Sequence, residues 1–291
     1  MSILVNEGSK ILIQGITGTQ GRLHTRLMLE YNARVVAGVT PGKKGEKVHG
    51  VPVYNTILQA KRDTAVDACL IMVPPAFVYS AACEAIENNI PLIVIITEHV
   101  PVYDSIRIRK LAREYSIKVV GPNTIGVISP GKSKIGIMPG YIYSKGNIGV
   151  ISRSGTLTHE VSSNLTYRGY GQSTCVGIGG DQVIGLDFVD AFELFRNDPE
   201  TESLIMIGEI GGTSEERAAD FIKETRYPKP IFSFIAGQTA PKGKKMGHAG
   251  AIVGQNLGSA RSKMQALEEA GVKNANTLEE LLDFVINKKT K

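Results

Sequence analysis

The sequence of 291 residues contains no tryptophan, 6% aromatic residues and three cysteines. Without tryptophan, and without a basic stripe interleaved with aromatic residues, it offers no stacking surface for bases, so nucleic acid is not an expected partner. The cysteines, Cys69, Cys83 and Cys175, are odd in number and form no CxxC pair. They are expected to be reduced thiols, and the scattered cysteines and histidines predict no metal site.

The sequence also lacks a long hydrophobic run. The longest, Pro91–Thr97, has the length of a buried strand and falls short of the roughly 20 apolar residues that span a bilayer. The first residues lead almost at once into a predicted strand, which leaves no room for a secretory signal or a transit peptide. We therefore expect a cytosolic protein that does not enter a membrane.

The net charge is +5, and the lysines concentrate in two glycine-containing loops. These loops are PGKKGEK at residues 41–47 and PKGKKMG at residues 241–247. Two short cationic loops suit small anionic ligands better than a nucleic acid duplex.

The first part of the chain alternates apolar strands with helical patterns. Five continuously apolar segments predict strands, at Lys10–Ile16, Ala33–Val39, Asp67–Val73, Pro91–Thr97 and Ile117–Asn123. Because these runs are apolar on both faces, we expect a parallel sheet covered by helices. Residues 1–123 are therefore predicted to form a Rossmann-like α/β domain.

A second βα series follows a segment rich in glycine, proline and serine. That segment, residues 124–145, is predicted to be a linker. Apolar runs at 147–152, 171–180, 203–212 and 229–238 predict the strands of the second series. Residues 146–291 are thus expected to form another doubly wound α/β domain.

Two turns of the first series are candidate ligand sites, because ligands of such sheets bind where strands lead into helices. The glycines of GITGTQG, Gly15–Gly21, let the backbone approach a diphosphate at a helix N-terminus, although a tight turn without a ligand remains an alternative. The pattern is GxxGxxG, which is a weak signal for NAD. After the next strand, Lys43 and Lys44 suit a ligand with an extra phosphate, such as NADP or coenzyme A, or else a solvated turn.

Two turns of the second series are candidates for phosphoryl chemistry. Ser154, Gly155 and Thr156 open a helix, which can bind a phosphate or serve only as a cap. His248 follows the last predicted strand, among small residues, and Glu209 ends another strand of the same sheet. Because a carboxylate that fixes the tautomer makes a neutral histidine a good nucleophile toward phosphorus, we favour a reactive His248 over an inert loop residue.

These motifs resemble, in one register along nearly the whole chain, the alpha subunit of succinyl-CoA synthetase, the succinate–CoA ligase of the citric acid cycle. The segments that carry the resemblance are GITGTQG, AGVTPGKKG, ITE, GPN, SRSGTLT, STCVGIGGD, MIGEIGG and APKGKKMGHAGAI. The resemblance implies a Rossmann-like CoA-binding domain followed by a flavodoxin-like, doubly wound ligase domain that carries a phosphohistidine.

The resemblance also implies roles for individual residues. It assigns coenzyme A to the following set: Thr17, Gly18, Thr19, Gln20, Lys43, Ile96, Thr97, Glu98 and Asn123. It makes His248 the phosphorylated residue and Glu209 the residue that orients it. It makes Ser154, Gly155 and Thr156 the helix start that holds phosphate.

The implied partner is a beta subunit with an ATP-grasp domain that binds most of the Mg-nucleotide, in a heterodimer or a dimer of heterodimers. The implied reaction interconverts succinyl-CoA, phosphate and a nucleoside diphosphate with succinate, coenzyme A and the triphosphate, through succinyl phosphate and a phosphohistidine.

Two departures from the family pattern concern the substrate. The family commonly has cysteine and proline where this chain has Thr124 and Ile125, and a tyrosine associated with the acyl substrate where it has His159. These departures keep open a related ligase for malate or another dicarboxylate. Two alternatives from other classes are a non-catalytic coenzyme-binding module and an NADP oxidoreductase.

Overall fold

The computed structural model describes residues 2–239, 247–248, 250–251 and 258–287. The chain divides into two compact units. The first unit comprises Leu4–Gly140 and Val183–Gly185, and the second comprises Met1–Ile3, Tyr141–Gln182 and Leu186–Lys291.

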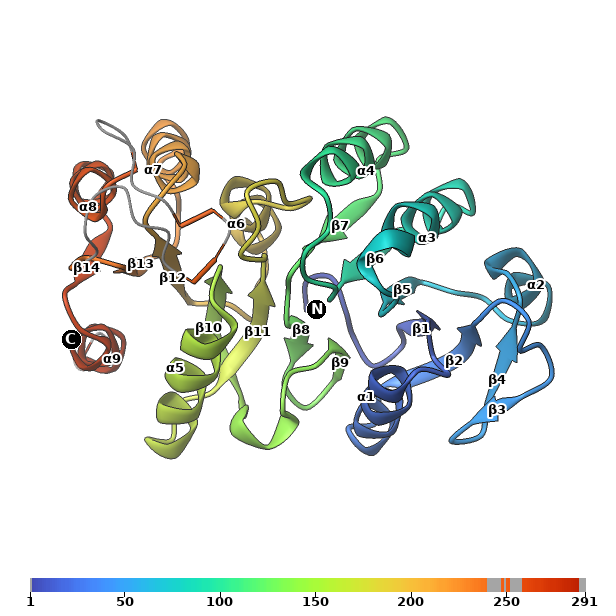
Figure 1. The fold of residues 1–291 in the computed structure, drawn as a ribbon. Helices are drawn as coiled ribbons and strands as arrows, with labels where there is room; N and C mark the ends of the chain where they lie inside the picture. The colour runs from blue at the N-terminus through green and yellow to red at the C-terminus, as the bar shows by residue number, and fades with distance from the viewer. Residues whose placement is uncertain (1, 240–246, 249, 252–257, 288–291) are drawn as a thin grey trace. The chain divides into compact units, whose positions relative to one another are not determined.

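The first unit contains, among its described residues, a sheet in the strand order β3-β4-β2-β1-β5-β6-β7 (Figure 1). Its strands are β1 Lys10–Gln14, β2 Arg34–Val39, β3 Lys47–Val48, β4 Val51–Tyr54, β5 Ala68–Ile71, β6 Leu92–Ile95 and β7 Lys118–Val120. Neighbours are parallel except for β3 and β4. Without β3, the order is 3-2-1-4-5-6 of a Rossmann fold, which confirms the predicted fold class.

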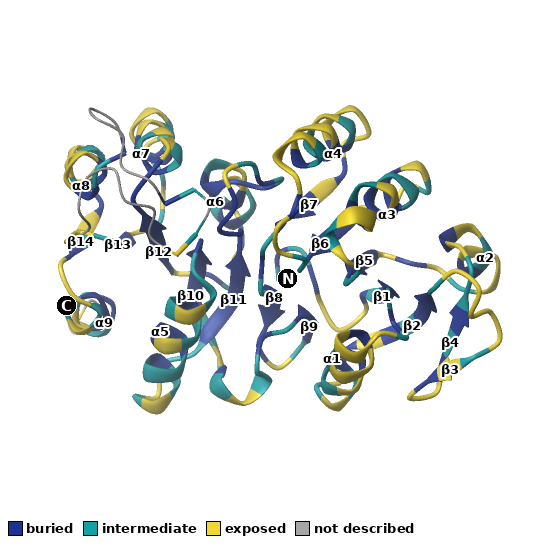
Figure 2. Ribbon diagram, in the orientation of Figure 1, coloured by how far each residue is buried: buried dark blue, intermediate teal, exposed yellow. Residues whose placement is uncertain are grey.

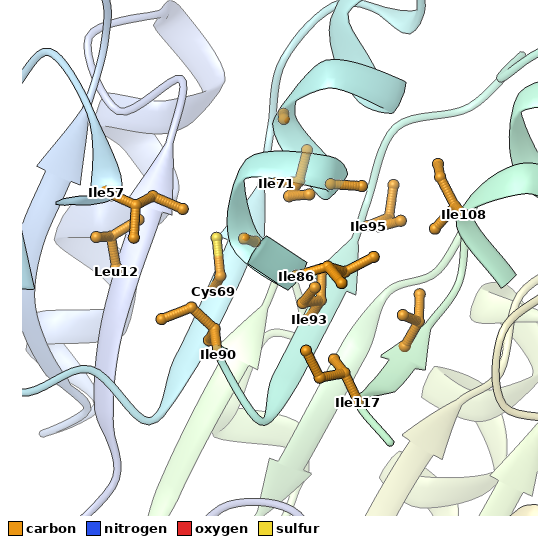
Figure 3. Packing of buried hydrophobic residues seen from close by; sticks show 14 of the residues in the cluster. Leu12, Ile57, Cys69, Ile71, Ile86, Ile90, Ile93, Ile95, Ile108 and Ile117 are labelled. Carbon is orange, nitrogen blue, oxygen red and sulfur yellow. The ribbon is translucent and has the colours of Figure 1, made fainter. Parts of the chain in front are cut away.

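Helices cover both faces of this sheet (Figure 1). They are α1 Thr19–Glu30, α2 Ile57–Asp63, α3 Pro75–Glu87 and α4 Val102–Glu114. Side chains alternate along a strand, so Ile93 and Ile95 of β6 share one face and meet Ile86 of α3 and Ile108 of α4 in a buried cluster (Figure 3). Cys69 belongs to the same cluster and is a free thiol, as the sequence predicts.

The segment predicted to be a linker, residues 124–145, contains a β-hairpin instead. Strands β8 Gly126–Ser129 and β9 Ser133–Gly136 pair in antiparallel fashion, and a 3-10 helix follows at Gly140–Ile142. The glycines that suggested a linker serve strand pairing: a Cβ on Gly126, at φ +99°, would lie 2.1 Å from Ile135 O. Only glycine allows this backbone approach and this dihedral angle without strain.

The second unit contains a run of parallel strands in the order β14-β13-β12-β10-β11 (Figure 1). They are β10 Lys145–Ser152, β11 Gln172–Gly177, β12 Ser203–Glu209, β13 Ile231–Ala236 and β14 Lys273–Ala275. Every residue of β11 and β12 is buried (Figure 2). Counted from β10, the order is 5-4-3-1-2, which is the predicted flavodoxin-like order read from its other edge.

The helices of the second unit are α5 Gly155–Tyr167, α6 Phe188–Arg196, α7 Ser214–Thr225, α8 Ala260–Glu269 and α9 Leu278–Asn287. The sequence prediction missed β14, so β13 is not the last strand of this sheet. Strand β14 is only three residues long and polar at its start, so it carries no apolar run. No helix in the described part of the chain has the length and apolar character needed to cross a membrane.

Candidate functional site

The turn after β1 depends on two glycines of GITGTQG. Gly15 has φ +83°, and a Cβ there would lie 2.6 Å from Met72 O at the end of β5. A Cβ on Gly21 would lie 2.2 Å from Gly15 O, because α1 begins close against the strand that precedes it. Both positions therefore require glycine if the chain is to turn this tightly.

This turn borders a cavity of about 560 Å³ in the first unit. Its lining comes from the ends of β1, β2 and β5 and from α3, and includes Gln14, Gly15, Thr17, Gly18, Val39, Thr40, Pro41, Met72, Val73, Pro74, Phe77, Ser80, Ala81 and Glu84. The Thr17 hydroxyl donates to Thr40 Oγ1 at 3.1 Å across the mouth of the turn. Of the residues predicted to bind coenzyme A, Thr17 and Gly18 line the cavity.

Lys43, Thr97 and Asn123, three other predicted coenzyme residues, are connected to this lining by hydrogen bonds. Lys43 N donates to Thr40 O at 3.1 Å, and its side chain pairs with Glu46 at 3.0 Å. The Thr97 hydroxyl donates to Val73 O at 2.7 Å, and Asn123 N donates to Thr97 O at 3.1 Å.

Of the remaining predicted coenzyme residues, three are polar and exposed, and the fourth, Ile96, directly follows β6. Thr19 and Gln20 open α1 at the protein surface. Glu98 is exposed beside His99, 3.9 Å from its ring nitrogen. Ile96 N donates to Ile71 O at 3.2 Å, which extends the β5–β6 pairing into this turn.

In the second unit, the structure brings His248 and Glu209 together. Strands β10 and β12 are parallel neighbours, with Ser152 opposite Ile207, so Glu209 and the residues after Ser152 lie at one edge. His248 Nδ1 lies 2.6 Å from Glu209 Oε2. Because an ionised carboxylate can only accept, Nδ1 carries the proton, and Nε2 of the neutral ring keeps its lone pair.

Glu209 is buried and has a second charged neighbour, Arg153. The Arg153 side chain is 6% exposed, and its Nε lies 3.0 Å from Glu209 Oε1. Arg153 Nη2 also donates to Asp181 O at 2.8 Å. The guanidinium thus balances the charge of the carboxylate that holds His248, and it connects the ends of β10, β11 and β12.

The His248 ring packs against the turn after β11. A Cβ on Gly180 would lie 2.6 Å from His248 Cγ, so a side chain there would displace the ring. The hydrogen bond that His248 donates to Glu209 raises the pKa of His248 above its ordinary 6.5, and this gain exceeds the lowering by burial and by Arg153. The side chain remains 29% exposed, which leaves the ring accessible to a reactant.

The start of α5 follows Arg153 directly. Ser154 is its N-cap and accepts from Leu157 N at 3.3 Å. The N–H groups of Gly155 and Thr156 lie in the first turn, where an α-helix offers no acceptor of its own. The positive end of the α5 dipole therefore lies where β10 ends, next to Arg153, and such a helix start favours an anionic group.

His159 lies one turn further along α5 and packs edge-on against Tyr143, with 6.4 Å between ring centroids. Burial lowers the pKa of His159. The two other substituted positions differ in burial: Thr124 is buried and accepts from Gly126 N at 2.9 Å, and Ile125 is half-buried.

Sequence reasoning missed Arg153, Gly180 and Asp181. All three stand inside segments that carry the family resemblance, SRSGTLT and STCVGIGGD, but no local pattern indicates that Arg153 would reach Glu209 and Asp181. The lysines of PKGKKMG at residues 242, 244 and 245 lie outside the described residues. Among the described residues, no group of three or more His, Cys, Asp or Glu side chains is arranged to hold a metal ion.

Two family models match the chain, the CoA binding domain over residues 6–99 and the CoA-ligase domain over residues 151–273. The alpha subunit of the ADP-forming succinate–CoA ligase of Methanothermobacter thermautotrophicus is 54% identical over 269 residues, which are 92% of this chain and 91% of the relative. The subunit of the same name from Aquifex aeolicus is 53% identical over 273 residues, 93% of this chain and 89% of the relative.

Solved structures with the same fold include the ATP citrate lyase of Methanothrix soehngenii in complex with citrate and coenzyme A. It aligns with 99% of this chain at a TM-score of 0.88 and 23% identity. This chain spans about half of that lyase chain, 52% of its length. At this identity, the similarity concerns the fold alone.

Proposed function

Because the chain belongs to the family of succinate–CoA ligase alpha subunits, we propose that His248 carries the phosphoryl group of this reaction. The activity is that of an acid–thiol ligase, which interconverts succinyl-CoA, phosphate and ADP with succinate, coenzyme A and ATP. The observation that carries the proposal is the 2.6 Å contact between His248 Nδ1 and the buried carboxylate of Glu209. It leaves Nε2 as the nucleophile.

The reaction begins when a phosphate oxygen attacks the thioester carbon of succinyl-CoA, and the C–S bond breaks to release coenzyme A. His248 Nε2 then attacks the phosphorus of succinyl phosphate, a P–N bond forms, and the P–O bond breaks to release succinate. The Nδ1 proton stays on the ring, where Glu209 stabilises the cationic phosphohistidine. In the last step, a terminal oxygen of ADP takes the phosphoryl group and the P–N bond breaks.

For substrate binding, we propose that the cavity of the first unit and its turns take coenzyme A, with Thr17, Gly18, Thr19, Gln20 and Lys43 at the turn after β1 and after β2. A second group is assigned to the neighbouring turns: Ile96, Thr97, Glu98 and Asn123. Ser154, Gly155 and Thr156 hold the phosphate before transfer, and His159 faces the acyl substrate. The GxxGxxG turn, the cavity and the free amides of α5 support these roles.

The alpha-subunit family implies a beta subunit as partner. We propose that this partner contributes an ATP-grasp domain that binds Mg-ADP, and that the two chains form a heterodimer or a dimer of heterodimers. A cytosolic location stays a prediction from the sequence.

The test is to purify the complex of both chains, incubate it with ATP labelled in the γ-phosphate, and map acid-labile phosphate. Label on His248 that leaves with coenzyme A and succinate, but not with coenzyme A and malate, is expected. Removal by malate instead would assign another dicarboxylate. A folded complex without label on His248 would overturn the proposal.

A further inference from the structure

A fully buried ion pair lies beside the end of β12, the strand that carries Glu209. Lys263 of α8 and Glu215 of α7 both have side chains with no solvent exposure, and Lys263 Nζ contacts Glu215 Oε2 directly. Lys263 Nζ is also 3.5 Å from Glu216 Oε2. The mechanism described above uses none of these groups.

The pair holds the backbone of the strand end that carries Glu209. Glu215 Oε1 accepts the main-chain N–H of Glu209 at 3.1 Å. Lys263 Nζ donates to Gly211 O, two residues further on, at 2.8 Å. The two side chains therefore fix the backbone at Glu209 and just after it.

Glycines next to the ion pair allow Glu215 to pack against β12 and allow the backbone at Gly211 and Gly258 to approach closely. A Cβ on Gly208 would lie 2.7 Å from Glu215 Cγ, so the glutamate stem passes directly against β12. Gly211 N donates to Gly258 O at 2.7 Å, and a Cβ on Gly258 would lie 2.9 Å from Gly211 Cα. The turn after Glu209 is thus held by α7, by α8 and by Gly258, which precedes the N-cap of α8.

A buried ion pair contributes little net stability, because the desolvation of two charges offsets their attraction. Apolar side chains of similar volume would fill the same space at no greater cost. What apolar side chains cannot supply is a directional acceptor for Glu209 N–H, and charge-assisted hydrogen bonds are short and well oriented.

We propose that Glu215, itself held by Lys263, is a positioning residue that sets Glu209 at hydrogen-bond distance from His248. The inference rests on the proposed function, because it gives the phosphorylation of His248 a structural support. A carboxylate displaced by about an ångström no longer orients the imidazole, and such misplacement costs on the order of a hundredfold in rate.

The test compares two double variants of the alpha–beta complex that differ in one acceptor. Glu215→Gln/Lys263→Met removes both charges and keeps an amide oxygen for Glu209 N–H. Glu215→Leu/Lys263→Met removes both charges and the acceptor as well. We expect the Gln variant to phosphorylate His248 within about threefold of the wild-type rate, and the Leu variant to be slower by tenfold or more.

A second readout distinguishes positioning from general destabilisation. The groups that face His248 are Glu209, Arg153 and Asp181, and the hydrogen bond that His248 donates to Glu209 is the main cause of its raised pKa. A titration of the His248 ring by NMR should therefore show a lower pKa in the Leu variant and an unchanged one in the Gln variant. Tyr227→Phe, which removes a 2.7 Å hydrogen bond to Phe192 O in the same unit, is the control and should leave this pKa unchanged.

Equal rates and an equal pKa of His248 in both double variants would overturn the positioning role. Equally slowed phosphorylation in both double variants, with the pKa of His248 unchanged, would also overturn it, because that result indicates a merely structural effect. The NMR titration needs no turnover. A wild-type complex without label on His248 would refute the proposed function, while a pKa that falls only in the Leu variant would still support the positioning role.

Discussion

In the first unit, the turn after β1 is shaped by glycine and borders a cavity whose lining includes the polar side chains of Gln14 and Glu84. In the second unit, Arg153 follows β10 and pairs with Glu209 at the end of β12, and both side chains are buried. A large ligand such as coenzyme A is held by shape and by backbone approach, whereas phosphoryl transfer needs fixed charge in a place that excludes water. Substitutions in one unit should therefore leave the function of the other intact.

His248→Asn should give the largest effect. The variant loses the only nitrogen that can accept the phosphoryl group at this position, so turnover should fall by at least about a thousandfold. Coenzyme A affinity, measured by titration calorimetry on the complex, should stay within about twofold, because the cavity lies in the first unit.

The control measurement for this variant is thermal unfolding. The side chain is partly exposed and lies against Gly180, so the melting temperature should change little. A fall as large as that of a core substitution would mean that the ring is structural.

Glu209→Gln should reduce the rate of His248 phosphorylation by about a hundredfold and change its dependence on pH. Only the neutral ring is a nucleophile, so the wild-type rate rises as pH increases through a pKa held above 6.5. Loss of the carboxylate lowers this pKa, so the acid limb of the profile should move to lower pH. Coenzyme A affinity should not change, and an equal loss of affinity would make Glu209 a structural residue.

The hydrogen-bonded pair of His248 and Glu209 predicts how the stability of the folded protein depends on pH. Because the folded-state pKa of His248 is raised, its contribution to stability is fully present below pH 6.5 and is lost as pH rises through the folded-state value. Glu209→Gln should remove this dependence. A calorimetric melting series for both proteins across this range checks the sign.

Gly15→Ala should impair the first unit and leave the second unit's chemistry intact. The added Cβ would lie 2.6 Å from Met72 O at φ +83°, so we expect at least a tenfold loss of coenzyme A affinity and a destabilisation of about 2 kcal/mol. The matched control is Gly169→Ala, which has φ +80° and no atom within 4 Å. It should cost only the left-handed backbone strain, about 1 kcal/mol, and leave affinity unchanged.

Apolar runs in the sequence predict where strands lie, but they do not predict the order of the strands in a sheet. The runs at Lys10–Ile16 and Pro91–Thr97 predict strands because each is longer than a turn and apolar on both faces, and β1 and β6 lie inside them. The order of the strands is a property of pairing between distant segments, so no local run contains it. The glycine-rich segment around Gly126 is predicted to be a linker because glycine favours turns. Glycine also permits very close strand pairing, which is its role in this hairpin.

In the candidate site as well, some residues could be predicted from the sequence and others could not. His248 and Glu209 could be paired from sequence because each follows a predicted strand of one sheet, and parallel strands end at the same edge. Arg153 and Lys263 could not, since a buried cation is recognised only by the carboxylate opposite it. Their partners, Glu209 and Glu215, are 56 and 48 positions away in the chain.

Lys43→Ala should have the smallest effect. It tests whether the first unit also uses a charged side chain to bind its ligand. The side chain is half exposed and pairs with Glu46 on the surface, so stability should change by less than about 0.5 kcal/mol. If Lys43 binds the extra phosphate of coenzyme A, affinity should fall by about three- to tenfold, and less at high salt. With dephospho-coenzyme A, which lacks that phosphate, wild type and variant should bind equally. Equal losses with both ligands, or the same loss in Lys44→Ala, would reduce the role of Lys43 to general surface charge.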